Sequence, residues 1–278
     1  MPLTLRPRRS VLYMPGSNSR ALDKARGLAA DGLIFDLEDA VSPDAKSIAR
    51  DQVMAALAQG GYGRREILVR VNGLATPWGR DDLLAAARSA ADGVILPKVE
   101  SAGQLREAEA ICRLPLWCMI ETPLGVLRAE EICAGSDNLV GLIMGTSDLA
   151  KDLHACHTAM RLPLLVPLGH CLLAARAFGL AILDGVHLDL DDLAGFEQSC
   201  LQGVELGFDG KTLIHPKTIE IANRIFAPSD SELAWSRRVI DGFQSGVAVI
   251  DGRLVEQLHV DNAKRIVALA EQIAAMGN

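Results

Sequence analysis

The feature that most constrains the fold of this chain is a regular alternation of short apolar runs with longer amphipathic segments. The runs are rich in Val, Ile and Leu, and most lack alternating polar residues, which is typical of parallel strands buried on both faces. The segments between them carry apolar residues at helical spacing. Together they predict βαβ units and a parallel sheet. The eight predicted strands are 11–14, 33–37, 67–71, 94–96, 116–120, 139–144, 180–183 and 212–214.

Eight strand–helix repeats close naturally into a (β/α)₈ barrel, for which about 250 residues suffice. The chain has 278 residues, of which 49% are apolar, so one barrel with a small addition accounts for it. An open doubly wound sheet is the alternative, but no Gly-x-Gly-x-x-Gly follows the first predicted strand. We therefore predict an α/β fold with a TIM barrel in residues 1–228. Helices are expected at 18–30, 46–58, 81–90, 102–112 and 164–177.

The alternation stops after His215-Pro216, and a different pattern follows. A helical stretch at 232–243 leads to two apolar runs joined by Asp251-Gly252, a strong hairpin signal. A final amphipathic helix is expected at 263–274. We predict that residues 229–278 form a C-terminal helix–hairpin–helix lid, too small to hold a core of its own, that serves in oligomerisation.

Composition excludes several classes of function. A formal net charge of −7 gives no general basic field for nucleic acid. No apolar run has membrane-spanning length, and the opening segment lacks a secretory apolar region. Six cysteines lie scattered without a C-x-x-C pair, as reduced thiols do. His154, Cys156 and His157 match no zinc spacing. A cytoplasmic location without membrane or nucleic-acid partners is expected.

Seven of the eight predicted strands stop at a charged or polar cluster. In a barrel these ends converge on one face, where active sites are built. Any one cluster is explained by helix capping, but seven that mix Arg, Lys, Glu and Asp indicate a site. They are Asp36-Leu37-Glu38-Asp39, Arg70-Val71-Asn72, Pro97-Lys98-Val99-Glu100, Glu121-Thr122, Gly145-Thr146-Ser147-Asp148, Asp184-Gly185 and His215-Pro216.

Two of these carboxylates, Glu121 and Asp148, come from neighbouring strands and are expected to face a common point. Such a pair suits Mg²⁺, with Mn²⁺ as a substitute, when water and substrate oxygens fill the other positions. A 2-oxo acid offers a carboxylate and a carbonyl oxygen in chelating position. Arg70 is then expected to bind the substrate carboxylate and to stabilise charge on an oxygen.

Six motifs in order along the chain resemble the citrate lyase beta-subunit-like family of the HpcH/HpaI aldolase superfamily, which includes malyl-CoA and citramalyl-CoA lyases. The similarity runs from Arg9 to about Ala263, and the ordered set is highly specific although each motif alone is weak. The motifs are Arg9-Ser10-Val11-Leu12-Tyr13-Met14-Pro15-Gly16, Asp36-Leu37-Glu38-Asp39-Ala40-Val41, Arg70-Val71-Asn72, Leu96-Pro97-Lys98-Val99-Glu100, Ile120-Glu121-Thr122, and Gly207-Phe208-Asp209-Gly210-Lys211-Thr212-Leu213-Ile214-His215-Pro216.

The resemblance assigns the family's two metal ligands to Glu121 and Asp148 and its substrate arginine to Arg70. Gly145 and Thr122 are expected to contact the substrate.

The acidic motif of Asp36, Glu38 and Asp39 is expected to lie near the metal and orient its waters, with Glu38 and Asp39 as catalytic candidates. Helix capping is the alternative for these two. Lys98 and Glu100 form either an internal ion pair or the edge of the site, and His215 is expected to be structural.

Two stretches depart from the family pattern. Where many relatives carry a Tyr-Ala-Arg-like stretch, this chain has residues 162–168 without it, which affects the expected acyl or CoA channel. Near the C-terminus Glu256 stands where the CoA-ester lyases usually have Asp. We expect Glu256 of an adjacent subunit to exchange a proton with the thioester α-carbon, with a surface glutamate as the alternative reading.

The function that the resemblance implies is a Mg²⁺-dependent lyase. It would reversibly cleave a 3-hydroxyacyl-CoA of malyl-, citramalyl- or citryl-CoA type to acetyl- or propionyl-CoA and a 2-oxo acid, as a homotrimer or hexamer. The alternatives are a citrate lyase beta subunit working with an acyl-carrier protein, a CoA-independent aldolase, a malyl-CoA thioesterase and a binding protein. The CoA-contacting residues stay open, apart from Arg9 and the loops after the first two strands.

Overall fold

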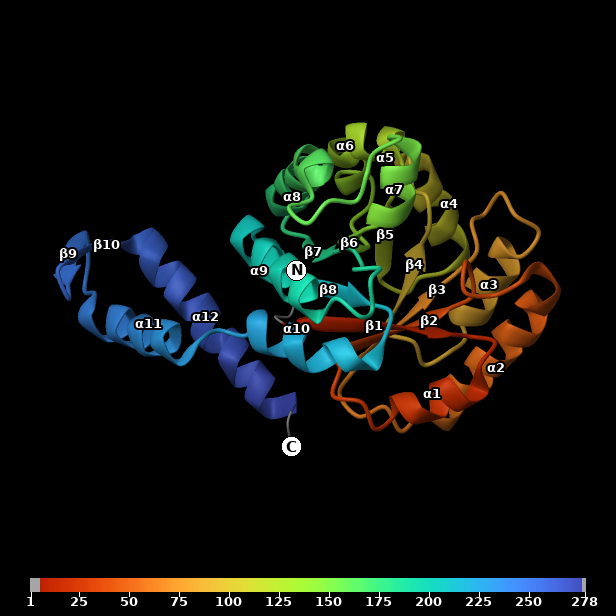
Figure 1. Cartoon of the computed structure of the whole chain (residues 1–278), viewed down its shortest axis with the longest axis horizontal. Helices are drawn as coiled ribbons and strands as arrows, with labels where there is room; N and C mark the ends of the chain where they lie inside the picture. The colour runs from red at the N-terminus through yellow and green to blue at the C-terminus, as the bar shows by residue number, and fades with distance from the viewer. Residues whose placement is uncertain (1–5, 277–278) are drawn as a thin grey trace.

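The computed structural model describes residues 6–276 and confirms the predicted barrel (Figure 1). Eight parallel strands pair in sequence order, and β1 pairs with β8, so the sheet is closed. Each predicted strand is present, with ends that differ by at most two residues from the expected ranges. The strands are β1 (Ser10–Pro15), β2 (Gly32–Asp36), β3 (Glu66–Arg70), β4 (Gly93–Leu96), β5 (Leu116–Ile120), β6 (Leu139–Met144), β7 (Ala181–Asp184) and β8 (Gly210–Leu213).

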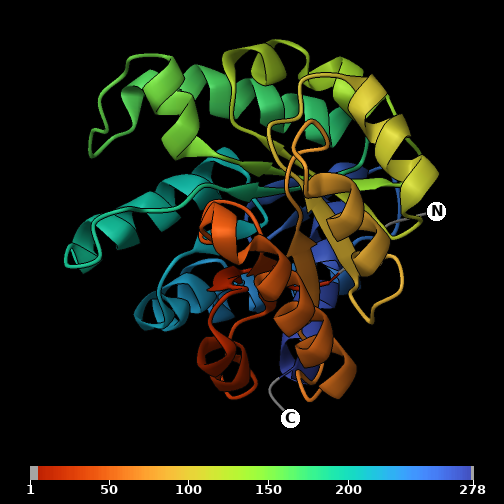
Figure 2. The same ribbon diagram turned by 90° about the vertical axis from the view of Figure 1, so that its right-hand side faces the viewer.

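Helices surround the strands, as the view in Figure 2 shows. The first helix is shorter than the predicted 18–30, because the chain turns after Ala25 to enter β2. The helices of the barrel are α1 (Ser19–Ala25), α2 (Lys46–Gln59), α3 (Gly79–Ala86), α4 (Ala102–Ile111), α5 (Pro123–Leu127), α6 (Ala129–Cys133), α7 (Thr146–Asp152), α8 (Leu165–Ala177), α9 (Leu193–Leu206) and α10 (Ile219–Ile225), with 3₁₀ turns at Pro43–Ala45, Leu162–Leu164 and Pro216–Thr218.

The interior of the barrel is filled by a layer of inward-facing side chains. Trp117 is its largest member and is fully buried, together with Ile34, Leu68 and Ile95. Gly141 on the neighbouring strand makes room for the indole, because a Cβ there would lie 2.3 Å from the Trp117 ring. A second, larger cluster packs between the strands and the helices. The barrel is therefore a packed core, and its chemistry lies at the two ends.

The C-terminal segment consists of α11 (Asp230–Gly242), β9 (Val247–Ile250), β10 (Arg253–Glu256) and α12 (Gln257–Met276). The predicted hairpin is confirmed: β9 and β10 are antiparallel, and Asp251 and Gly252 both have positive φ. The segment extends away from the barrel in Figure 1.

The expectation that the C-terminal segment holds no core of its own is wrong. Val239, Val255, Val260 and Ala263 form a small buried cluster there. The reason is the length of α12, which spans 20 residues where only 12 were expected and packs along α11.

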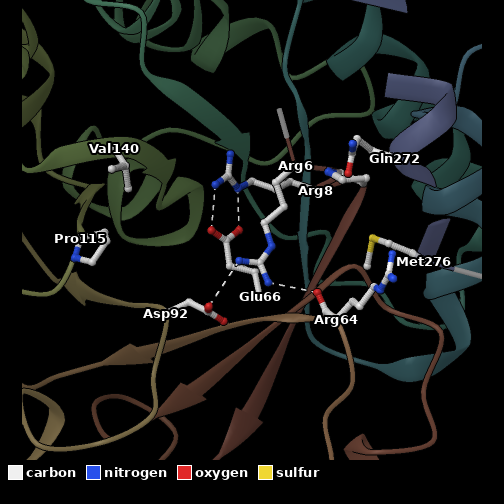
Figure 3. Close-up of a pocket in the computed structure, with 10 residues that line it drawn as sticks. Arg6, Arg8, Arg64, Glu66, Asp92, Pro115, Val140, Gln272 and Met276 are labelled. Atoms are coloured by element: carbon white, nitrogen blue, oxygen red, sulfur yellow. Dashed lines mark hydrogen bonds and ion pairs between the residues drawn. The ribbon is translucent and has the colours of Figure 1, made fainter. Parts of the chain in front are cut away.

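The N-terminal end of the barrel is closed by ion pairs and approached by α12 (Figure 3). Arg8 binds Glu66 through two hydrogen bonds of 2.5 and 2.8 Å, and its guanidinium lies over the Trp117 ring. Arg64 donates to the carbonyl of Ala275 in α12 at 3.0 Å. A cavity of about 510 Å³ lies at this end, but the charges of Arg8 and Glu66 are already matched.

Candidate active site

A cavity of about 340 Å³ opens at the carboxyl ends of the strands. Six residues expected at the site line it together: Asp36, Asp39, Arg70, Glu121, Gly145 and Asp148. They follow or end strands β2, β3, β5 and β6. Four of the seven strand-end clusters therefore meet at this cavity, and the other three do not line it. The remaining lining residues are Tyr13, Ala40, Met119, Met144, Thr146, Ser147, Val186, Thr212 and Ile214.

Arg70 is buried at the base of this cavity and is already engaged by carboxylates. Its Nε and Nη2 donate to the two oxygens of Asp36 at 2.7 and 2.6 Å. Its Nη1 lies 2.9 Å from Glu38 Oε2 and 3.4 Å from Asp39 Oδ2. The bidentate edge expected to bind a substrate carboxylate thus holds Asp36 instead. A substrate can reach only the remaining Nη hydrogens.

Asp36 lines the cavity, but its carboxylate does not have the role expected from the sequence. Besides Arg70, its Oδ1 accepts from the Glu38 amide at 2.9 Å and its Oδ2 from the Ala40 amide at 3.1 Å. A carboxylate has about four lone-pair sites, and these four donors use them all. Asp36 therefore fixes Arg70 and the loop after β2, and has no capacity left to orient metal-bound waters.

Glu121 is a buried carboxylate without an ion-pair partner in residues 6–276. Its Oε1 accepts from the Lys98 amide at 2.8 Å. Burial, and then the charge of Glu38, raise the pKa of Glu121 to about 8. A divalent cation would remove this cost, because it supplies the missing charge and lowers the pKa of a carboxylate that binds it. Glu121 with Asp148 therefore fits the two-carboxylate Mg²⁺ site expected from the sequence.

Gly145 gives Glu121 its position. A Cβ at Gly145 would lie 2.3 Å from Glu121 Cβ and 2.6 Å from Glu121 Oε2. Only glycine therefore allows the carboxylate to lie beside the start of α7, which carries Asp148 in its first turn. In the described part of the chain no group of three or more His, Cys, Asp or Glu forms a metal cluster. A cation here would have two protein carboxylates.

Comparison with known proteins decides the family. Residues 9–216 match the model of the HpcH/HpaI aldolase/citrate lyase family. The chain belongs to this family. A (3S)-malyl-CoA thioesterase of Cereibacter sphaeroides (strain ATCC 17025) is 52% identical over 278 residues, covering 98% of this chain and 97% of that protein. The citrate lyase subunit beta of Escherichia coli (strain K12) is 35% identical and covers 96% of this chain and 94% of that protein.

Among solved structures of the family, the CitE protein of Mycobacterium tuberculosis in complex with magnesium, acetoacetate and coenzyme A is similar with a TM-score of 0.80. It is 31% identical, and the match covers 96% of this chain and 99% of that one. The likeness includes most of the C-terminal segment as well as the barrel. No helix within residues 6–276 has the length and apolar character needed to span a bilayer.

Two residues that were expected to contact the substrate or CoA lie elsewhere. Thr122 does not line the cavity: it caps α5, and its hydroxyl accepts from the Gly125 amide at 3.0 Å. Arg9 is at the opposite end of the barrel, bound to Asp31 through its Nε and Nη2, so the suspicion that it binds CoA is not supported. His215 is structural as expected, since its Nδ1 accepts from the Lys217 amide at 3.1 Å.

Lys98 does not pair with Glu100. Its ammonium lies 3.2 Å from Glu38 Oε1 and 3.8 Å from Asp148 Oδ2. Glu38 is thus held between Arg70 and Lys98, while burial raises its pKa. The second alternative for Lys98, a place at the edge of the site, is therefore the correct one.

Asp184 ends β7 but faces away from the cavity, contrary to its inclusion among the strand-end clusters. It is fully buried between the strands and α9, where Lys211 Nζ lies 2.7 Å from one oxygen. Arg161 Nη1 contacts both oxygens at 2.7 and 2.8 Å. This network joins β7 and β8 to the loop before α8, and apart from the charges themselves no sequence pattern indicates it.

Tyr13 is the cavity residue that sequence reasoning overlooked. Its ring lies 5.0 Å from the Arg70 guanidinium carbon. Burial raises the pKa of Tyr13 well above its ordinary value, so the hydroxyl stays protonated and can only donate or accept as a neutral group. It stands two residues after the inward-facing Val11, and the period of two in a strand would have located it.

Proposed function

We propose that this protein is a Mg²⁺-dependent enzyme that cleaves and forms the carbon–carbon bond between an acyl-CoA and a 2-oxo acid. The observation that carries the proposal is the buried Glu121, which has no ion-pair partner among the described residues and lines one cavity with Asp148 and Arg70. The M. tuberculosis CitE complexes with magnesium and coenzyme A, acetoacetate or pyruvate support the cofactor and the substrate class.

The residues of this chain have distinct parts in such a reaction. Glu121 and Asp148 would hold Mg²⁺, which supplies Lewis acidity and a template for the substrate carboxylate and the adjacent oxygen. The Nη2 hydrogen of Arg70 that does not bind Asp36 would stabilise charge on that oxygen, and Asp36 keeps the guanidinium in place. The apolar side chains of Met119, Met144, Val186 and Ile214 limit the water around the reacting atoms.

A second candidate is hydrolysis of a malyl-CoA-type thioester to the free acid and CoA. It is favoured by the 52% identical relative, which is named a (3S)-malyl-CoA thioesterase. The lining residues of the described cavity include no His or Cys, so a His-activated nucleophile has no support there. Hydrolysis would therefore have to use the same carboxylates and cation as the lyase reaction.

Product analysis separates the two candidates. The protein is incubated with Mg²⁺ and malyl-CoA, citramalyl-CoA or citryl-CoA, and the products are identified by mass. We expect acetyl-CoA together with glyoxylate, pyruvate or oxaloacetate. Free malate and CoA, formed without acetyl-CoA, would establish the thioesterase instead. Turnover of free 2-oxo-3-deoxy acids, or activity only in the presence of an acyl-carrier protein, would favour the other two alternatives.

We further propose that residues 1–228 form the catalytic barrel and that residues 229–278 are a lid that reaches the cavity of an adjacent subunit in a homotrimer or hexamer. In support, the hairpin extends away from its own barrel, with Val247, Val249 and Leu254 exposed. Glu256 at the end of β10 would then be the group that exchanges a proton with the thioester α-carbon.

Glu256→Gln should bind Mg²⁺ and the oxo acid normally but lose exchange of the acetyl-CoA methyl protons with solvent deuterium. A glutamine amide cannot accept the proton, whereas Glu256→Asp should retain part of the exchange. Mass spectrometry of acetyl-CoA in D₂O measures this. Glu271→Gln, which removes an exposed glutamate from the same segment, is the control. Unchanged exchange in Glu256→Gln would refute the assignment.

A further inference from the structure

Lys98 has an unusual backbone conformation for its residue type. It is the second residue after β4 and has a φ of 49°, in the left-handed region that β-carbon sterics disfavour. Strain of this kind is kept where the surrounding structure uses it. Here the peptide N–H points toward Glu121, while the side chain extends toward Glu38 and Asp148.

One residue thus contacts three carboxylates that follow three different strands, β2, β5 and β6. The peptide N–H holds Glu121 at 2.8 Å, and the ammonium lies 3.2 Å from Glu38 and 3.8 Å from Asp148. Two of these, Glu121 and Asp148, are the proposed metal ligands. The backbone and the side chain of Lys98 therefore act on the site separately, and a substitution can separate them.

The charges around the site show what the ammonium contributes. Five carboxylates lie together here, and in the described part of the chain only Arg70 and Lys98 form ion pairs with them. Lys46, which is nearby, donates to the carbonyl oxygens of Leu37 and Glu38 instead. Arg70 is fixed by Asp36, so Lys98 is the cation that can move. Its side chain is about half exposed, at 49%.

We propose that Lys98 is a positioning residue whose ammonium weakens the binding of the divalent cation and strengthens the binding of the anionic oxo acid. A positive charge beside Asp148 repels an incoming cation, and it competes for the same oxygen. Once the cation is bound, the same charge attracts a substrate that carries a carboxylate. This inference rests on the proposed function, because it takes Glu121 and Asp148 as the metal ligands.

The test is a titration of the full-length protein with Mn²⁺, followed by electron paramagnetic resonance, and then a titration of the Mn²⁺-loaded protein with glyoxylate, pyruvate or oxaloacetate. Lys98→Asn removes the ammonium and suits the left-handed conformation, which Asn adopts more readily than Lys. We expect Mn²⁺ to bind this variant about five-fold more tightly and the oxo acid about ten-fold more weakly. Lys98→Arg, which keeps the charge, should stay within about two-fold of the unaltered protein for both ligands.

Opposite changes for the two ligands distinguish this role from a structural one, because general damage to the site weakens both. Lys151→Asn is the matched control: it removes a lysine from α7 whose ion pair is with Asp152, and both affinities should be unchanged. If Lys98→Asn does not fold, Lys98→Gly, which has no steric penalty at this φ, replaces it.

The outcomes separate the two proposals. Equal or weaker Mn²⁺ binding by Lys98→Asn, with normal binding by the unaltered protein, would overturn the role of Lys98 alone. Failure of the unaltered protein to bind Mn²⁺ or any of the three oxo acids, or full retention of Mn²⁺ binding by Glu121→Gln, would overturn the proposed function as well.

Discussion

Glu121→Gln should fold normally, and its Mg²⁺-dependent turnover should fall by more than about 100-fold. Removing a residue that only hydrogen-bonds a metal ligand already costs up to about 100-fold in activity, so removing a ligand should cost more. The amide keeps the size of the side chain and can still accept from the Lys98 amide, but it offers the cation no charge. Steady-state rates at saturating substrate, measured over a range of Mg²⁺ concentrations, give the comparison.

The stability of the same variant, measured against pH and Mg²⁺, provides a second test. In the metal-free protein the folded-state pKa of Glu121 is about 8, above its ordinary value of 4.5. The folded state therefore holds this proton more tightly than the unfolded state, and the free energy of unfolding should fall as the pH rises from about 4.5 to about 8. Glu121→Gln should lack this decline. Mg²⁺ should raise the melting temperature of the unaltered protein and have little effect on the variant.

Glu100→Gln is the control, because Glu100 lies in the same loop between β4 and α4 as Lys98 and does not line the cavity. Wild-type turnover of Glu121→Gln at low Mg²⁺ would show that the cation binds elsewhere.

Asp184→Leu should lower the free energy of unfolding by about 3–5 kcal/mol, the usual cost when one partner of a buried ion pair is removed. Lys211 is fully buried and Arg161 is mostly buried, and both would lose their counter-ion. Urea denaturation at pH 7 measures the loss. The folded fraction should retain its turnover, because Asp184 faces α9 and not the cavity.

The network also predicts a pH dependence. Burial alone would raise the pKa of Asp184, but the charges of Lys211 and Arg161 lower it below its ordinary range. The contribution of Asp184 to stability is therefore present above the pKa of the unfolded state and is lost as the pH falls through the folded-state pKa.

Glu197→Gln, which breaks the exposed pair with Arg224, is the control for the stability loss and should cost less than about 1 kcal/mol. A comparably small loss in Asp184→Leu would contradict the argument.

Sequence reasoning located the barrel and most of the site for a physical reason that also explains its errors. Parallel strands buried on both faces must be apolar, so their positions and their polar ends are visible in one sequence. Whether a residue at such an end faces the cavity or the helices depends on a shift of a single position. Asp184 and Thr122 were misplaced for this reason, and Tyr13 was overlooked.

The contacts made by the charges could not be predicted at all. Arg70 donates two hydrogen bonds to Asp36, and Lys98 adopts a positive φ. Both features depend on distances between separate loops. Composition and spacing contain no measure of those distances. The length of α12 was also underestimated, because the helix begins at Gln257, before the predicted start at residue 263.

The packed layer around Trp117 has a consequence for how ligands enter and leave the cavity that contains Glu121. Within residues 6–276 its buried side chains pack between the cavity at the N-terminal end and the cavity that contains Glu121, and the two cavities share no lining residue. A molecule that reaches Glu121 would therefore enter and leave through the opening at the carboxyl ends of the strands. A compound bound at that opening would block substrate entry and product release together, whereas a compound bound beside Arg8 and Glu66 would leave turnover unchanged.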